Sequence, residues 1–74
     1  METTRVLIII EGGAVRDVYA DAENVEVLIV DYDTDGVEPE SIKRSVHGDD
    51  YVGRIEPAAV DPELTGAFFA REQE

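Results

Sequence analysis

The sequence predicts an α+β fold, with an antiparallel β-sheet of three to four strands and a C-terminal α-helix packed on it. An N-terminal hairpin plus a third strand form the sheet. Three observations support this prediction: two β-branched runs flank Gly12 and Gly13, a third apolar run ends at Asp31, and helical spacing follows Asp61. With 74 residues the chain forms one compact acidic domain, residues 1–74.

Residues 5–19, RVLIIIEGGAVRDVY, predict the hairpin. Paired glycines supply the positive φ angles that a two-residue hairpin turn requires. Such a turn gives the register Ile10 opposite Val15, Ile8 opposite Asp17 and Val6 opposite Tyr19.

The first strand is apolar on both faces from Val6 to Ile10. This pattern is typical of a central strand that is covered on both sides. Because so short a chain has little material for two covering layers, either a second short helix or another subunit must cover one face. A homodimer is therefore among the expected states.

Four further segments complete the predicted fold. Residues 24–32 form the third strand, with Val25, Val27 and Ile29 on one face. Residues 37–46 are expected to form one or two helical turns, with Ile42 and Val46 on one face. A loop at 47–50 leads into a fourth strand at about 50–56. The C-terminal helix has Asp61 as N-cap and Pro62 at its first position, and its packing face consists of Leu64, Ala67, Phe68 and Arg71, with Gly66 allowing close approach to a strand.

The composition indicates a folded protein with a strong negative charge. Twenty-one of the 74 residues are Val, Ile, Leu or Phe, above the level of disordered chains, and cysteine is absent. Eighteen acidic residues against six basic ones give a net charge of −12. This field repels nucleic acid and anionic membranes and attracts basic protein surfaces. The N-terminus lacks the long apolar core of a secretory signal, which favours a cytoplasmic protein.

The segment VLIVDYDTDG, residues 27–36, raises the question of a metal site. Asp31, Asp33, Asp35 and Gly36 match the opening of a calcium-binding loop, but Ile42 stands where a bidentate glutamate should close it. The run is also similar to the haloacid-dehalogenase phosphatase signature, which we reject because Asp35 replaces its Thr or Val and the chain is too short for that fold. Three interpretations of the aspartates stay open: a calcium site, a solvated turn, or a patch of carboxylates that a basic partner recognises.

No other motif indicates chemistry, and we expect neither enzyme activity nor a cofactor. His47 lies beside a glycine in an expected loop, and no cysteine nucleophile exists. We expect instead a contact patch for a basic partner, with Tyr32 as an aromatic anchor. Its acidic members are Asp31, Asp33, Asp35, Glu38, Glu40, Asp49 and Asp50. If the third strand continues through the aspartates, alternate carboxylates lie about 6.5–7 Å apart, near the spacing of phosphates along DNA.

The chain resembles the small anti-CRISPR inhibitors of phages and mobile elements in its size, acidity, lack of cysteine and α+β pattern. The segments EGGAVRDVYAD and VEVLIVDYDTDG are also similar to small proteins of bacterial mobile elements. The resemblance implies a non-catalytic inhibitor that binds a basic nucleic-acid-binding surface of a CRISPR–Cas complex, by acidic mimicry of nucleic acid. One alternative is an acid-rich accessory or structural protein that acts through its apolar sheet face; its acids could then be an adaptation to high salt, as in halophilic proteins. The other alternative is a small calcium-binding module.

Overall fold

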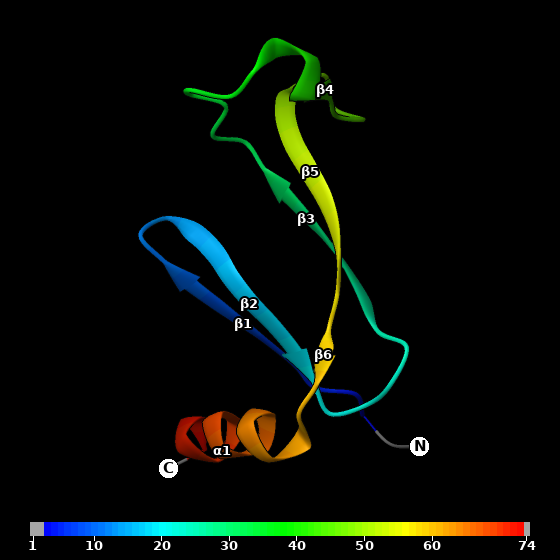
Figure 1. The fold of residues 1–74 in the computed structure, drawn as a ribbon, viewed down its shortest axis with the longest axis vertical. Coiled ribbons are helices and arrows are strands. Elements are labelled where there is room, and N and C mark those ends of the chain that lie inside the picture. The colour runs from blue at the N-terminus through cyan, green and yellow to red at the C-terminus, as the bar shows by residue number, and fades with distance from the viewer. Residues whose placement is uncertain (1–2, 74) are drawn as a thin grey trace.

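The computed structural model describes residues 3–73 and has the α+β architecture that the sequence predicts (Figure 1). Its strands are mostly antiparallel, and one C-terminal helix packs against the N-terminal hairpin. In chain order the elements are β1 (Val6–Glu11), β2 (Ala14–Ala20), β3 (Glu26–Asp31), a 3-10 turn η1 (Pro39–Ser41), β4 (Lys43–Arg44), β5 (Asp50–Pro57), β6 (Ala59–Val60) and α1 (Pro62–Glu72).

The strands are divided between two three-stranded sheets. One sheet has the order β1-β2-β6, with β6 parallel to β2, and the other has the order β3-β5-β4. The third strand therefore lies beside β5 and not beside the hairpin. As a result β1 is an edge strand, and the prediction that it is central was wrong. As an edge strand, β1 leaves part of its apolar surface uncovered: the side chains of Ile8 and Ile10 are exposed.

The hairpin turns at Gly12 and Gly13, whose φ angles are +60° and +79°. Ile10 pairs with Val15 as predicted, but a β-bulge at Ile9/Ile10 shifts the rest of the register by one residue. The predicted pairs beyond the bulge were therefore wrong, because a bulge adds one residue on one strand. The observed pairs are Ile8 with Val18 and Val6 with Ala20.

The chain buries little of its apolar surface. Among the described residues, Val18 and Ala20 are the only buried hydrophobic side chains. Thr65 of α1 is the only buried polar one. The radius of gyration is 14.8 Å, whereas a compact chain of this length has about 11 Å. Figure 1 shows why: the hairpin and the β3–β5 ribbon diverge from a common end, and α1 lies beside the hairpin only.

The two sheets contact each other through β2 and β5. Arg54 donates from Nη2 to the carbonyl oxygen of Val15, at 2.9 Å. Ile29, which pairs with Arg54 across the ribbon, lines the shallow hollow at this contact together with Val15. One face of the β3–β5 ribbon, the face of Ile29 and Arg54, is thus directed at the hairpin.

Residues 37–46 differ from the prediction. Only Pro39–Ser41 are helical, and Ile42 already has extended backbone before the short strand β4. Val46 is 98% exposed, so the predicted helical face of Ile42 and Val46 does not exist. Pairing of Lys43 with Tyr51 and of Arg44 with Asp50 replaces the helical hydrogen bonds that a second turn would have made.

The C-terminal helix begins as predicted. Pro62 occupies its first turn, and the Asp61 side chain accepts a hydrogen bond from the Leu64 N–H at 3.0 Å. The packing face was wrong in part: Leu64 is half-buried, but Ala67, Phe68 and Arg71 are exposed, and the most buried helical residue is Thr65.

The other phenylalanine is tied to the N-terminal segment, because the Arg5 guanidinium carbon lies 5.1 Å from the centroid of the Phe69 ring. The prediction for Gly66 was also wrong. A Cβ added there meets no atom within 4 Å, so no strand approaches it closely.

Asp61→Ala is expected to lower the free energy of unfolding by about 1 kcal/mol, because the substitution removes the N-cap acceptor. Urea denaturation followed by circular dichroism measures the change. Asp61→Asn is the control, since its amide oxygen keeps an acceptor and should retain most of the stability. Equal stability of Asp61→Ala and the unmodified chain would show that this cap contributes nothing.

Candidate functional site

The predicted contact residues lie together at one end of the β3–β5 ribbon. β3 ends at Asp31, which pairs with Val52, and β5 begins two residues earlier at Asp50. The loop after β3, η1, β4 and the loop before β5 therefore form a single lobe, at the top of Figure 1. We call its acidic side chains the acidic end: Asp31, Asp33, Asp35, Glu38, Glu40, Asp49 and Asp50.

The three alternating aspartates form consecutive turns. The Asp31 carboxylate accepts the Asp33 N–H at 2.9 Å, and the Asp33 carboxylate accepts the Asp35 N–H at 3.2 Å. Aspartate commonly bonds to the backbone two residues on, and such bonds compete with strand pairing. The strand does not continue past Asp31, so the condition for a straight row of phosphate-spaced carboxylates is not met.

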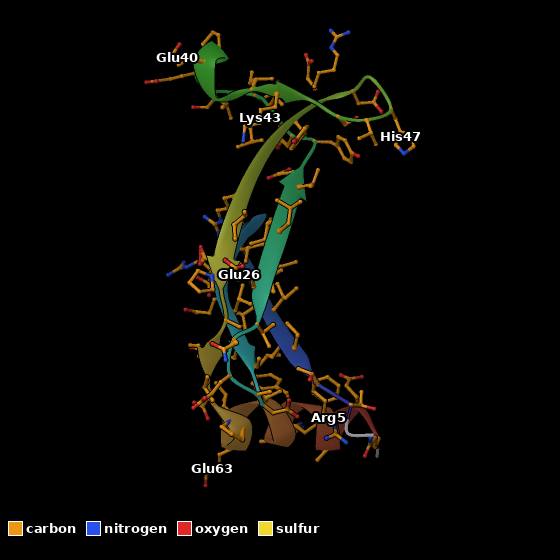
Figure 2. All side chains as sticks on the ribbon, turned by 90° about the vertical axis from the view of Figure 1, so that its right-hand side faces the viewer. Arg5, Glu26, Glu40, Lys43, His47 and Glu63 are labelled. Atoms are coloured by element: carbon orange, nitrogen blue, oxygen red, sulfur yellow. The ribbon has the colours of Figure 1, made fainter. Side chains whose placement is uncertain are left out.

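Few cations balance the acidic end. Its segment, residues 31–50, contains Lys43 and Arg44 as the only lysine and arginine against seven acids. Arg44 and Asp50 form an ion pair at 3.9 Å, and both side chains are largely exposed. The other ion pairs in the described part of the chain, Arg16–Glu11 and Arg54–Glu56, lie outside the segment. Figure 2 shows Glu40 and Lys43 at this end and Arg5 and Glu63 at the opposite end of the molecule.

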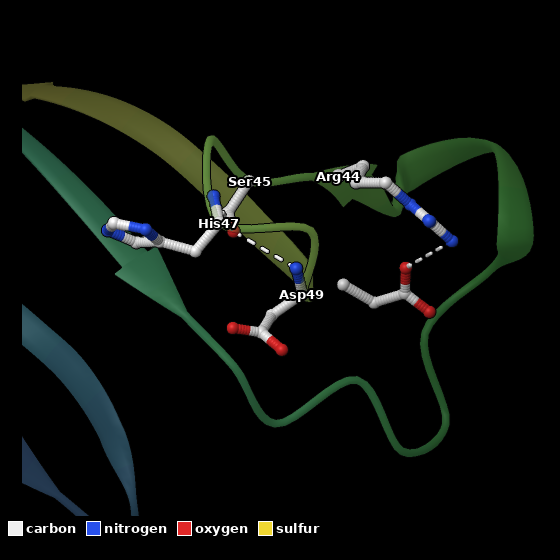
Figure 3. Close-up of polar contacts among 5 residues, drawn as sticks. Arg44, Ser45, His47 and Asp49 are labelled. Atoms are coloured by element: carbon white, nitrogen blue, oxygen red, sulfur yellow. Dashed lines mark hydrogen bonds and ion pairs between the residues drawn. The ribbon is translucent and has the colours of Figure 1, made fainter.

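The loop before β5 is held by one serine. The Ser45 hydroxyl oxygen accepts the N–H of His47 at 3.2 Å and the N–H of Asp49 at 3.1 Å, and the Ser45 N–H donates to the Asp49 carbonyl at 2.7 Å (Figure 3). The Asp49 carboxylate and the His47 ring are exposed. This turn presents Asp49 beside the Arg44–Asp50 pair, as Figure 3 shows.

Tyr32, the predicted aromatic anchor, follows β3 directly and is 58% exposed. It is therefore available to a partner at the margin of the acidic end. Within residues 3–73, no three His, Cys, Asp or Glu side chains are grouped closely enough to hold a metal ion. Asp31 and Asp33, the first two positions of the calcium-loop match, use carboxylate oxygens for the turns described above.

The sequence predicted an exposed apolar face on the first strand but not a second one, on the side of the β3–β5 ribbon that points away from the hairpin. Leu28 lies opposite Ile55 and Val30 opposite Gly53, so these side chains share one face. The exposed fractions are 62% for Leu28, 42% for Val30 and 65% for Ile55. The alternation of Leu28 and Val30 was visible in the sequence, but the identity of the neighbouring strand was not.

Comparison of the chain with protein-family models, curated protein sequences and solved structures found no match. In the part of the chain that the structure describes, no helix has the length and apolar character needed to cross a membrane.

Proposed function

We propose that the protein is a non-catalytic inhibitor that binds a basic, nucleic-acid-binding surface of a bacterial defence complex of the CRISPR–Cas type. The acidic end is the binding surface in this proposal, with Tyr32 at its margin. The observation that carries it is the concentration of seven acids in one lobe that contains two cationic side chains. The resemblance in size and composition to anti-CRISPR inhibitors supports the choice of target.

The mechanism is electrostatic competition for the site that nucleic acid would occupy. A net charge of −12 steers the protein toward a Lys/Arg-lined groove, and such steering raises association rates by about 10- to 1,000-fold at low salt. Because the aspartates lie in turns and not along a strand, mimicry here rests on the density of charge and not on a regular row of phosphate-like spacings.

The double variant Asp35→Lys/Glu40→Lys is expected to lower the association rate with the target by about tenfold and to flatten its salt dependence. Neither side chain holds a hydrogen bond in the described structure, so the turns built on Asp31, Asp33 and Ser45 are kept. The measurement is a pull-down from bacterial lysate at low and moderate salt with mass spectrometry, followed by surface plasmon resonance on the captured complex.

The matched control is Glu23→Lys/Glu72→Lys, which changes the net charge equally but alters exposed residues outside the acidic end. Retention of a nucleic-acid-handling complex by the control, its loss from the Asp35/Glu40 variant and its displacement by DNA support the proposal. Equal retention by both variants would refute a specific role of the acidic end.

A second candidate function is that of an acid-rich accessory or structural protein. The exposed face of Leu28, Val30 and Ile55 favours it, because large apolar patches on small proteins mark interaction surfaces. If the acids serve only to keep the protein soluble in high salt, the purified protein should unfold at low salt and regain stability as salt screens the charges.

A further inference from the structure

We propose that two copies of the chain pack face to face through the outer surface of the β3–β5 ribbon, and that folding depends on this contact. The ribbon has one face directed at the hairpin, through Ile29 and Arg54, and one that is uncovered within the chain. We call the uncovered side the ribbon face and define it by Leu28, Val30, Tyr51 and Ile55.

The ribbon face lacks charged side chains at its centre. Tyr51 shares the face with Gly53 and Ile55, because alternate residues of a strand point to the same side. A Cβ added at Gly53 would lie 2.7 Å from Cε2 of Tyr51, so the ring lies across the glycine. The absence of a side chain at Gly53 thus leaves room for the tyrosine ring on this face, where it adds to the apolar surface that a second sheet could pack against.

The chain exposes more surface than a compact monomer of its mass. The accessible surface is 5986 Å², whereas a folded monomer of 8.2 kDa exposes about 4,500 Å². The excess is about 1,500 Å² per chain, and obligate homodimers bury about 1,000 to 2,500 Å² per chain. A second copy packed on the ribbon face covers part of this excess, which also includes Ile8, Ile10 and Phe68 on other elements.

A second copy fits this face better than a basic partner does. A basic surface is attracted to carboxylates, and those of the ribbon lie at its two ends: the acidic end at one, and Glu26, on the side of Leu28 and Val30, at the other. A partner that covers the ribbon face is needed each time the chain folds. The reason is that Val18 and Ala20, the buried apolar residues of the described part, make only a small core. Another copy is present wherever the protein is made.

The charges also select how the copies are arranged. β3 has a free edge, but antiparallel pairing of two β3 edges about their centre would put Glu26 opposite Asp31 of the other copy at both ends. Face-to-face packing avoids that direct pairing, because Asp31 points to the opposite side of β3 from Leu28 and Val30. A two-fold axis between the sheets and perpendicular to the strands further separates the two acidic ends, so that the dimer displays one at each extremity.

Sedimentation equilibrium of the full chain tests the proposal. The expected mass is twice 8.2 kDa, and the melting temperature should rise with protein concentration. Leu28→Thr/Ile55→Thr keeps net charge and β-propensity but makes the ribbon face polar, and we expect its dimer dissociation constant to rise at least about tenfold. The matched control is Val46→Thr/Val60→Thr, at exposed apolar residues outside the face, which should stay dimeric.

Each outcome decides the proposal. Loss of folded structure in Leu28→Thr/Ile55→Thr alone supports it, because residues this exposed in a monomer tolerate threonine. A wild-type chain of 8.2 kDa with a concentration-independent melting temperature overturns it, and a dimer that both double variants keep overturns the choice of face.

The inference does not depend on the proposed inhibition. Raising NaCl from about 0.1 to 1 M should tighten or preserve the dimer, since salt screens repulsion between two acidic copies, whereas it should weaken binding to a basic target. A dimer that dissociates as salt rises would contradict an apolar interface. Because salt acts in opposite directions on the dimer and on binding to a basic target, failure of one proposal can be told apart from failure of the other.

Discussion

Val18→Asp is expected to unfold the protein at neutral pH. Val18 is 5% exposed and pairs with Ile8 in the hairpin, so the new carboxylate would be buried without a cationic partner. Burial of an unpaired ionised carboxylate costs several kcal/mol even after relaxation. A domain of 74 residues has about 4 to 11 kcal/mol of total stability, so most or all of it is lost. Far-UV circular dichroism and thermal denaturation measure the effect.

The control is Val46→Asp, the same chemical change at a side chain that is 98% exposed. Its free energy of unfolding should change by no more than about 0.5 kcal/mol, as for most surface substitutions. A cooperative transition of wild-type midpoint in Val18→Asp would show that the hairpin core described above is not the core of the protein in solution.

Gly12→Ala/Gly13→Ala is expected to lower the free energy of unfolding by about 2 to 4 kcal/mol. Both glycines have φ angles in the left-handed region, +60° and +79°, where an L-residue costs about 1 to 2 kcal/mol. No atom lies within 4 Å of the added Cβ at either position, so the cost is one of backbone conformation and not of collision. Urea denaturation, with the hairpin amides followed by hydrogen exchange, measures it.

Gly66→Ala is the matched control, because its Cβ also meets no atom within 4 Å but its backbone is helical. The same substitution should there raise the stability by about 1 kcal/mol. Opposite signs at the two sites are the expected result. A loss at Gly66 as large as that in the turn would show that α1 needs the glycine for a contact outside the single chain.

The two proposals use different parts of one ribbon. The acidic end offers exposed carboxylates to a basic target, and the ribbon face offers Leu28, Val30 and Ile55 to a second copy. If both hold, the dimer presents two acidic ends and binds a target with two basic sites more tightly through avidity. The apolar residues on both faces of β1 suggested a subunit interface on that strand. The proposed dimer contact uses the ribbon face of β3 and β5 instead.

Local signals in the sequence were sufficient for the hairpin turn, the strand at β5 and the helix start. Each depends on residues close in the chain: paired glycines with positive φ, a proline that ends a strand, and Asp61 before Pro62. Ile10 and Val15 pair as the turn requires, but the bulge beyond them shifts the register. A bulge depends on packing across strands, and nothing in the local sequence specified it.

The sequence by itself determined the α+β class, the excess of acids and the grouping of most of the acidic end, because these follow from composition, local propensity and proximity along the chain. The tertiary structure alone decided that β3 pairs with β5 and not with the hairpin, which made β1 an edge strand and left Leu28, Val30 and Ile55 exposed on one face. Pairing between distant strands depends on which partner buries the most surface for the least loop entropy, and alternation of apolar residues is the same for every candidate partner.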